Sequence, residues 1–335
     1  MPRHLSIAGW FTLGTLALAA CGENTPTQPT GAADAPVPTP TLAAASNTWT
    51  NKASVLGDQY FGGWDVGTAP NSSGVSIVYA IGGSSADNGS TGFPIQAYNP
   101  VTNTWSYKNS SADAFGLNGV GKIGSRLYWS GGFDYGSGSL AAHKDVFAYD
   151  YTTDRLIRKA SIPIYSGNGV TAVIDGKLYV LPGTCATELY PSPGYCATEA
   201  NRKLYRYNPG TNTWTGRASA PHFHKHGVAG VINGKLYVAA GGHDFDPVAD
   251  LDVYDPATNT WKTLAPFPGG GGGAGAVIQG QLFVVGAGGA YAYDPATNQW
   301  KTKAAPTSSG PIIRIFIAGK PYLFLAGRPS QLYTP

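Results

Sequence analysis

Four of the six histidines lie close together in the sequence and could bind a metal ion. His222 and His224 precede a predicted strand, and His243 with Asp244 follows the hairpin that this strand begins. In extended backbone, alternate side chains point the same way about 6.6 Å apart, so two imidazoles could converge on one ion. The candidate metal ligands are therefore His222, His224, His243 and Asp244.

A structural role for these histidines is the interpretation that we favour over metal binding. Lys225 places a positive charge within the same stretch, where it would repel a cation. Histidines before a strand also pack and form hydrogen bonds in proteins that bind no metal. We therefore expect no cofactor, with a divalent metal ion as the alternative.

Other polar and aromatic residues could bind a ligand. A tryptophan beside an aspartate at 64–65 resembles a sugar-stacking platform, although packing between structural units is the interpretation that we favour. Two basic pairs could hold an anionic or hydroxylated ligand in a central funnel. No Ser-His-Asp spacing, paired catalytic carboxylates or zinc-protease motif is present. The candidate ligand-binding residues are Trp64, Asp65, His143, Lys144, Arg314 and Arg328.

The composition favours an all-β protein. Glycine makes up 46 of the 335 residues, about twice its average share, and charged residues make up 12%, about half of theirs. The 20 Tyr, 12 Phe and 8 Trp suit pleated sheets, and the low charge excludes coiled coils and charged disordered chains. A net charge of +3 is too small for phosphate neutralisation to drive nucleic-acid binding.

The N-terminus predicts export. Residues 1–20 combine Arg3, an apolar run over 5–18 and a small-residue cleavage site, which is the pattern of a secretory signal peptide. The four residues at 18–21, Leu-Ala-Ala-Cys, resemble the lipobox of bacterial lipoproteins, which implies that Cys21 becomes the lipid-modified N-terminus. Several acyl chains would anchor the protein stably in a membrane.

A spacer follows the predicted lipidation site. Residues 21–45 are rich in Thr, Pro and Ala and contain no aromatic residue, so we expect an extended tether. Gly22 stands where an aspartate would retain a lipoprotein in the inner membrane. In a host with an outer membrane, the expected location is the outer membrane or the cell surface.

One unit recurs from residue 46 to the C-terminus. Its first half is an Asx-Pro turn that leads to tryptophan, at 99–105, 208–214, 255–261 and 294–300, with a degenerate copy at 150–156. Asp or Asn opens the turn, Pro sets φ, and the second Asn tolerates the left-handed region. Its second half is a hairpin with Asn233-Gly234 or Asp175-Gly176 at the tip, ending in paired small residues.

These units resemble kelch repeats, in which a double glycine, a tyrosine and a tryptophan recur at matching positions. The resemblance covers residues 46–335, or about 48 residues for each of six units. It implies an all-β, six-bladed kelch-type β-propeller with four antiparallel strands in each blade. The C-terminus stops before the expected tryptophan, and Asn47-Thr48-Trp49 has the missing sequence, so the N-terminal strand should close the ring.

The connections divide between two faces of the predicted propeller. Turns within the two hairpins of each blade are short, whereas loops such as 84–94, 133–145 and 184–202 are long and variable. Recognition sites are commonly built from such loops on a rigid frame, so we expect the site on the variable loop face. Cys185 and Cys196 share the longest loop, and in an oxidising compartment we expect them to form a disulfide.

These observations favour a binding module over an enzyme. We expect an exported, lipid-anchored monomer that recognises a glycan, peptide or protein. The alternative is a metal-dependent or sugar-modifying enzyme of the epimerase or lyase type that uses the histidines at 222–243. Kelch-like copper oxidases need a cysteine cross-linked to tyrosine, and no cysteine remains for that role. Fold alone does not decide between these classes.

Overall fold

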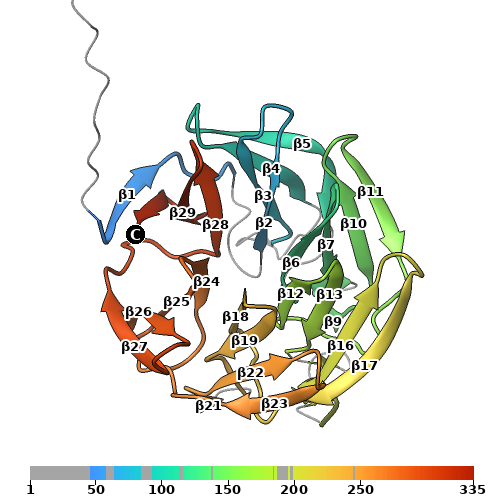
Figure 1. Ribbon diagram of the computed structural model, residues 1–335. Coiled ribbons are helices and arrows are strands. Elements are labelled where there is room, and N and C mark those ends of the chain that lie inside the picture. Colours follow the sequence, from blue (N-terminus) through green and yellow to red (C-terminus); the bar gives the residue numbers. More distant parts are fainter. Residues whose placement is uncertain are drawn as a thin grey trace, which may run out of the picture. The chain divides into compact units, whose positions relative to one another are not determined.

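Six antiparallel sheets of four strands surround a central axis in the computed structural model (Figure 1). The structure describes residues 46–57, 64–83, 93–112, 116–136, 139–183, 185–186, 195–196, 199–243 and 246–335. The first strand of each blade contacts the first strands of both neighbouring blades, which places these six strands around the axis. The predicted six-bladed propeller is confirmed.

The blades follow one another in chain order. Blade one contains β2 (Asp65–Pro70), β3 (Ser76–Ile81), β4 (Phe93–Asn99) and β5 (Thr104–Ala112). Blade two contains β6 (Val120–Ile123), β7 (Arg126–Ser130), β10 (Val146–Asp150) and β11 (Arg155–Lys159). Blade three contains β12 (Val170–Ile174), β13 (Lys177–Leu181), β16 (Lys203–Asn208) and β17 (Thr213–Ser219).

The second half of the ring repeats this pattern. Blade four contains β18 (Val228–Ile232), β19 (Lys235–Ala239), β22 (Leu251–Asp255) and β23 (Thr260–Thr263). Blade five contains β24 (Ala274–Ile278), β25 (Gln281–Gly286), β26 (Gly289–Asp294) and β27 (Gln299–Lys303). Blade six contains β28 (Ile312–Ile317), β29 (Lys320–Leu325), β30 (Ser330–Thr334) and β1 (Thr48–Lys52).

The N-terminal strand closes the ring, as the sequence predicts. β1 is the outermost strand of blade six and pairs antiparallel with β30, with Trp49 opposite Tyr333. Both ends of the folded chain therefore belong to one blade. The edge of β30 that faces away from β29 is paired with β1.

A repeated set of hydrogen bonds joins neighbouring blades. In blade four, the Tyr254 hydroxyl donates to Asn259 Oδ1 (2.8 Å), which also accepts from the backbone N–H of Ala218 in blade three (3.0 Å). The indole of Trp261 donates to the carbonyl of Ala218 (3.0 Å). Asn259 has a φ of 58°, a left-handed conformation that asparagine tolerates better than most residues. The residues of the turn motif thus also form the hydrogen bonds that join neighbouring blades.

The core consists of one hydrophobic cluster at each of the six blade interfaces within the described residues. Between blades six and one, the rings of Phe324 and Tyr98 stack with centroids 4.5 Å apart, and both side chains are buried. Aromatic contacts of this kind add to the free energy from burial of apolar area. Packing of each blade on its two neighbours therefore fixes the positions of the six innermost strands around the axis.

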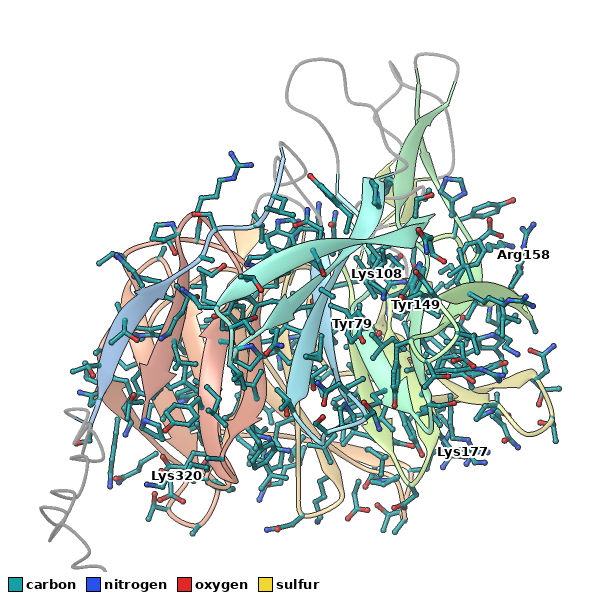
Figure 2. All side chains as sticks on the ribbon, turned by 90° about the horizontal axis from the view of Figure 1, so that it is seen from above. Tyr79, Lys108, Tyr149, Arg158, Lys177 and Lys320 are labelled. Carbon is teal, nitrogen blue, oxygen red and sulfur yellow. The ribbon has the colours of Figure 1, made fainter. Side chains whose placement is uncertain are left out.

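The two faces of the propeller differ. Lys177 and Lys320 directly follow short hairpin turns and lie on the lower side in Figure 2. The opposite, variable loop face receives the blade-to-blade connections and the links from the second to the third strand of each blade. Three of these links form small sheets: β8 (Phe133–Gly136) with β9 (Ser139–Ala142), β14 (Cys185–Ala186) with β15 (Tyr195–Cys196), and β20 (Gly242–His243) with β21 (Asp246–Pro247). A 3-10 helix, η1 (Glu199–Arg202), precedes β16.

Within the part of the chain that the structure describes, no helix has the length and apolar character needed to span a membrane.

Candidate functional site

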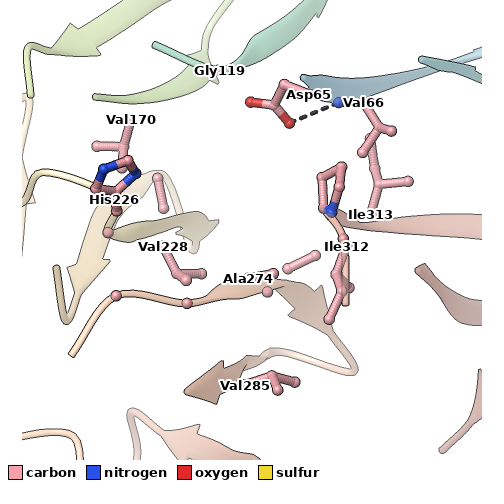
Figure 3. A pocket seen from close by; sticks show the side chains of 18 of the residues that line it. Asp65, Val66, Gly119, Val170, His226, Val228, Ala274, Val285, Ile312 and Ile313 are labelled. Carbon is pink, nitrogen blue, oxygen red and sulfur yellow. Dashed lines mark hydrogen bonds between the residues drawn. The ribbon is translucent and has the colours of Figure 1, made fainter. Parts of the chain in front are cut away.

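A cavity of about 660 Å³ lies at the axis of the propeller, on the variable loop face. Each blade contributes the residues at which its innermost strand begins, so the wall is a ring of six similar positions (Figure 3). These positions are Asp65, Gly119, Val170, Val228, Ala274 and Ile312. The volume lies within the range of about 300–1,000 Å³ typical of ligand pockets.

Small residues keep the cavity open. Gly119 has a φ of 105°, and a Cβ at this position would lie 3.0 Å from Thr171 Cβ and 3.4 Å from Asp65 Oδ2. Gly275 is also constrained, because a Cβ there would lie 2.1 Å from the carbonyl oxygen of Phe283. Any larger side chain at these two positions would strain the backbone or crowd the wall.

Asp65 is the charged member of this ring. It begins β2, and its Oδ1 accepts a hydrogen bond from the backbone N–H of Val66 (2.7 Å). Burial raises the pKa of Asp65 to about 6, and the Val66 hydrogen bond opposes this rise. At neutral pH the side chain is therefore mostly a carboxylate in apolar surroundings.

His226 lies across the cavity from Asp65 (Figure 3). Its backbone N–H donates to the Asn168 carbonyl in blade three (2.7 Å), and its carbonyl accepts from the Gly273 N–H in blade five (3.1 Å). These bonds hold His226 at a φ of 57°, which is uncommon for a histidine. Burial, and secondarily the charge of Lys225, lowers the pKa of His226, so the ring is neutral at neutral pH.

The structure brings one of the predicted pairs to the cavity. Trp64 and Asp65 both line it, and Trp64 also packs against the hydrophobic cluster between blades six and one. Trp64 therefore takes part in the packing between blades, and its role in ligand binding stays a prediction. His226, the remaining member of the four clustered histidines, lines the cavity although it was not among the predicted ligand-binding residues.

The other four ligand-binding candidates are not among the residues that line this cavity. Lys144 Nζ lies over the ring of Tyr165, 4.3 Å from its centroid. Arg314 is exposed, with its guanidinium 5.4 Å from the centroid of Phe316. His143 and Arg328 flank other loop segments, so a binding role for these four residues stays a prediction.

The blade-four histidines form a hydrogen-bonded cluster around a buried carboxylate. His224 Nε2 lies 3.1 Å from Asp252 Oδ2, and its Nδ1 lies 2.8 Å from the carbonyl oxygen of Ala240. A carbonyl only accepts, so Nδ1 donates to Ala240. His224 thus links the Ala240 carbonyl to the carboxylate of Asp252, whose side chain has no exposed surface.

Two further groups stabilise the Asp252 carboxylate. His222 Nδ1 lies 3.0 Å from Asp252 Oδ2, and the Thr263 hydroxyl donates to Oδ1 (2.8 Å). Burial alone would raise the pKa of Asp252, but the hydrogen bonds from His224, Thr263 and His222 outweigh it and hold the pKa below its usual value. His222 and His224 therefore share a protein carboxylate.

The predicted metal site includes residues beyond the described side chains. The described residues contain no group of three or more His, Cys, Asp or Glu arranged to hold a metal ion. Asp244 and the side chain of His243 lie outside the described part. The four-residue metal site accordingly stays a prediction.

Residues 225–268, within blade four, match the Kelch motif family. The chain is 26% identical to human Kelch-like protein 23 over 211 residues, which cover 62% of this chain and 35% of that protein. It is 31% identical to Kelch-like protein 25 of Xenopus tropicalis over 208 residues, covering 58% and 31%. These findings support a similarity to kelch-repeat proteins. The matched region of this chain spans about a third of each of these relatives.

A solved structure supports the same fold. The propeller superimposes on the structure of YjhT with a TM-score of 0.63 at 15% identity, covering 84% of this chain and 98% of that one. At this identity the likeness concerns the fold alone.

Proposed function

We propose that this chain is a binding module that takes a peptide segment of a protein ligand into the axial cavity. The observation that carries the proposal is the ring of six inner-strand positions around one preformed opening on the variable loop face. A site whose walls are held by six packed blades needs little reorganisation on binding.

The chemistry of the wall favours a peptide over a glycan. The described lining residues are mainly Gly, Ala, Val and Ile, with Trp64 as their single aromatic side chain. Carbohydrate sites usually combine aromatic platforms with many polar groups, whereas this wall is largely aliphatic with a few polar positions such as Thr171 and Asn168. A glycan ligand is the alternative outcome of the test below.

The proposal includes export and lipid anchoring, which rest on the sequence. The lipobox-like segment would attach acyl chains at Cys21, and 22–45 would hold the propeller away from the outer membrane or cell surface. Cys21→Ser should move the protein from the membrane fraction to the soluble fraction when it is expressed in a bacterial host. Retention of the variant in the membrane fraction would contradict the anchor.

Peptide display on the full chain tests the binding site. Ser309 is exposed at the rim of the cavity, so Ser309→Trp should block its mouth and reduce binding of the selected peptides at least tenfold. Lys320→Trp introduces the same bulk on the opposite face and should leave binding unchanged. The proposal fails if no peptide is enriched, if only glycans bind in a parallel array, or if Ser309→Trp has no effect.

A further inference from the structure

Asp65 breaks the chemical pattern of the ring around the cavity. At the six matching positions, the other five blades place Gly119, Val170, Val228, Ala274 and Ile312. In Figure 3 the carboxylate of Asp65 points into the opening between these apolar side chains. A core position would take another aliphatic residue, so the carboxylate needs an explanation other than packing.

No cationic side chain of the described residues neutralises this carboxylate. Among the described residues, the polar contact of Asp65 is the backbone N–H of Val66, and no salt bridge joins it to a basic side chain. The parts of 46–335 outside the described residues contain no lysine or arginine. The other ionisable group among the described lining residues, His226, is neutral at neutral pH. A cationic group of a ligand can therefore supply the positive charge that the described residues do not place at Asp65.

The surroundings of Asp65 fit an aliphatic stem that ends in a cation. Val66 and Ile313 lie beside the carboxylate in Figure 3, and Gly119 leaves space in front of Oδ2. Lysine and arginine bury their methylene stems along apolar surface while the charged end meets a carboxylate. An anionic ligand would meet repulsion here, and a purely apolar one would leave the carboxylate buried without a partner.

We propose that the ligand of this cavity inserts a lysine or arginine side chain, with its stem against the aliphatic wall and its cationic group on Asp65. The inference rests on the proposed peptide-binding function and specifies the chemistry that the site recognises. It predicts that the ligand protein presents an exposed basic residue, flanked by residues small enough to enter a cavity of about 660 Å³.

Matched tripeptides test the inference with the full chain. N-acetyl-Ala-Lys-Ala-amide and its norleucine analogue differ by the ammonium group and keep similar stems. Calorimetry or an NMR titration at about pH 7.5 should show at least tenfold tighter binding of the lysine peptide to the wild type. An arginine peptide should also bind more tightly than the norleucine peptide.

Asp65→Asn keeps the shape of the side chain and removes its charge. It should abolish the preference for the lysine peptide while leaving weak binding of the norleucine peptide. Asp145→Asn removes an equal charge outside the cavity, where Asp145 pairs with Arg158, and should keep the preference. Unfolding curves of both variants establish that they are folded.

The outcomes separate this inference from the proposed function. It is overturned if the two tripeptides bind the wild type equally, if neither gives a saturable signal, or if Asp65→Asn keeps the preference. If display still selects peptides that Ser309→Trp excludes, peptide binding stands although the cation assignment fails. If no peptide binds at all, the proposed function itself fails.

Discussion

The hydroxyl of Tyr333 donates a hydrogen bond to Asn47 Oδ1 over 3.0 Å, although the two residues are 286 positions apart. In blade four the corresponding tyrosine and asparagine, Tyr254 and Asn259, are five positions apart. The two chain ends thus rebuild a contact that the other blades form within one turn. Asn47 Oδ1 also accepts from the Ala304 N–H of blade five (2.9 Å), which ties the closing blade to its neighbour.

Asn47→Ala should weaken ring closure. The substitution removes the acceptor of the Tyr333 hydroxyl and the Ala304 amide, and we expect a loss of about 1–3 kcal/mol in the free energy of unfolding. Deletion of β1 (Thr48–Lys52) should cost more, since it uncovers the edge of β30. Urea unfolding followed by tryptophan fluorescence measures both, and unchanged midpoints would contradict closure by the N-terminal strand.

Asp65→Asn should stabilise the protein above pH 6. The folded pKa of Asp65, about 6, lies above the ordinary value of 3.8, so the folded state holds the proton more tightly than the unfolded state. The stability contributed by this group is complete below pH 3.8 and is lost as the pH rises through 6. At about pH 7.5 the gain should reach up to about 3 kcal/mol.

The control for this prediction is the pH dependence of the difference in unfolding free energy between wild type and Asp65→Asn. Near pH 4 the wild-type side chain is protonated in the fold, so the difference between wild type and Asp65→Asn should nearly vanish. If wild type and Asp65→Asn were equally stable at both pH values, the carboxylate would not be destabilised by its surroundings. Higher stability together with lost lysine-peptide binding is the pattern expected of a residue kept for function.

Asp252→Asn should destabilise the fold strongly. The variant would leave His224 and His222 without the carboxylate that binds them, and loss of one partner of a buried ion pair costs about 3–5 kcal/mol. Asp250→Asn is the control, because this partly exposed carboxylate lies 3.7 Å from His222 Nε2 and should contribute less than about 1 kcal/mol.

The effect of Asp252 should depend on pH in the opposite sense to that of Asp65. Hydrogen bonds hold the pKa of Asp252 below its ordinary value, so its stabilising contribution is present above that value and is lost as the pH falls through the folded pKa. Denaturant unfolding at neutral and strongly acidic pH should therefore show the penalty of Asp252→Asn shrinking with acidification. A penalty that grows in acid would refute the assignment.

Cys185 and Cys196 should be joined in the exported protein. They are directly opposite each other in the pair β14–β15. Opposed residues in antiparallel strands have Cα atoms about 4.5 or 5.5 Å apart, and disulfides span about 4.4–6.8 Å. Thiol titration in denaturant without reductant should detect neither cysteine, whereas Cys185→Ser should expose one thiol. Reactive thiols at both Cys185 and Cys196 in the wild-type chain would rule out the bond.

Much of the fold could be predicted because its signals are local. The turn from Asp255 to Trp261 carries its own φ preferences, and Asn233-Gly234 specifies a tight hairpin whatever surrounds it. Such units repeat along the chain, and one unit is split between the two ends of the folded region. A closed ring is the arrangement in which every strand of these units has a partner.

The positions of the candidate site residues depend on contacts between segments that are far apart in the sequence, which no local pattern encodes. Asp252 occupies an ordinary position in β22, and its role becomes visible only where the segment carrying His224 reaches it. Likewise Arg314 sits on an innermost strand, yet it is exposed beside Phe316 and does not line the cavity. The direction of a side chain relative to the propeller axis follows from the tilt and register of its strand, which packing of the whole ring determines.

The sequence by itself determined the number of blades, their strand order, the closing strand and the face that carries variable loops, because turn chemistry and strand alternation act over a few residues. Only the tertiary structure decided that Asp65 and His226 face one cavity. Asp65 enters from blade one and His226 from blade four, where inter-blade hydrogen bonds hold its left-handed backbone conformation. The two side chains come together at the axis because all six blades pack into a ring. The sequence of a single blade does not encode this proximity.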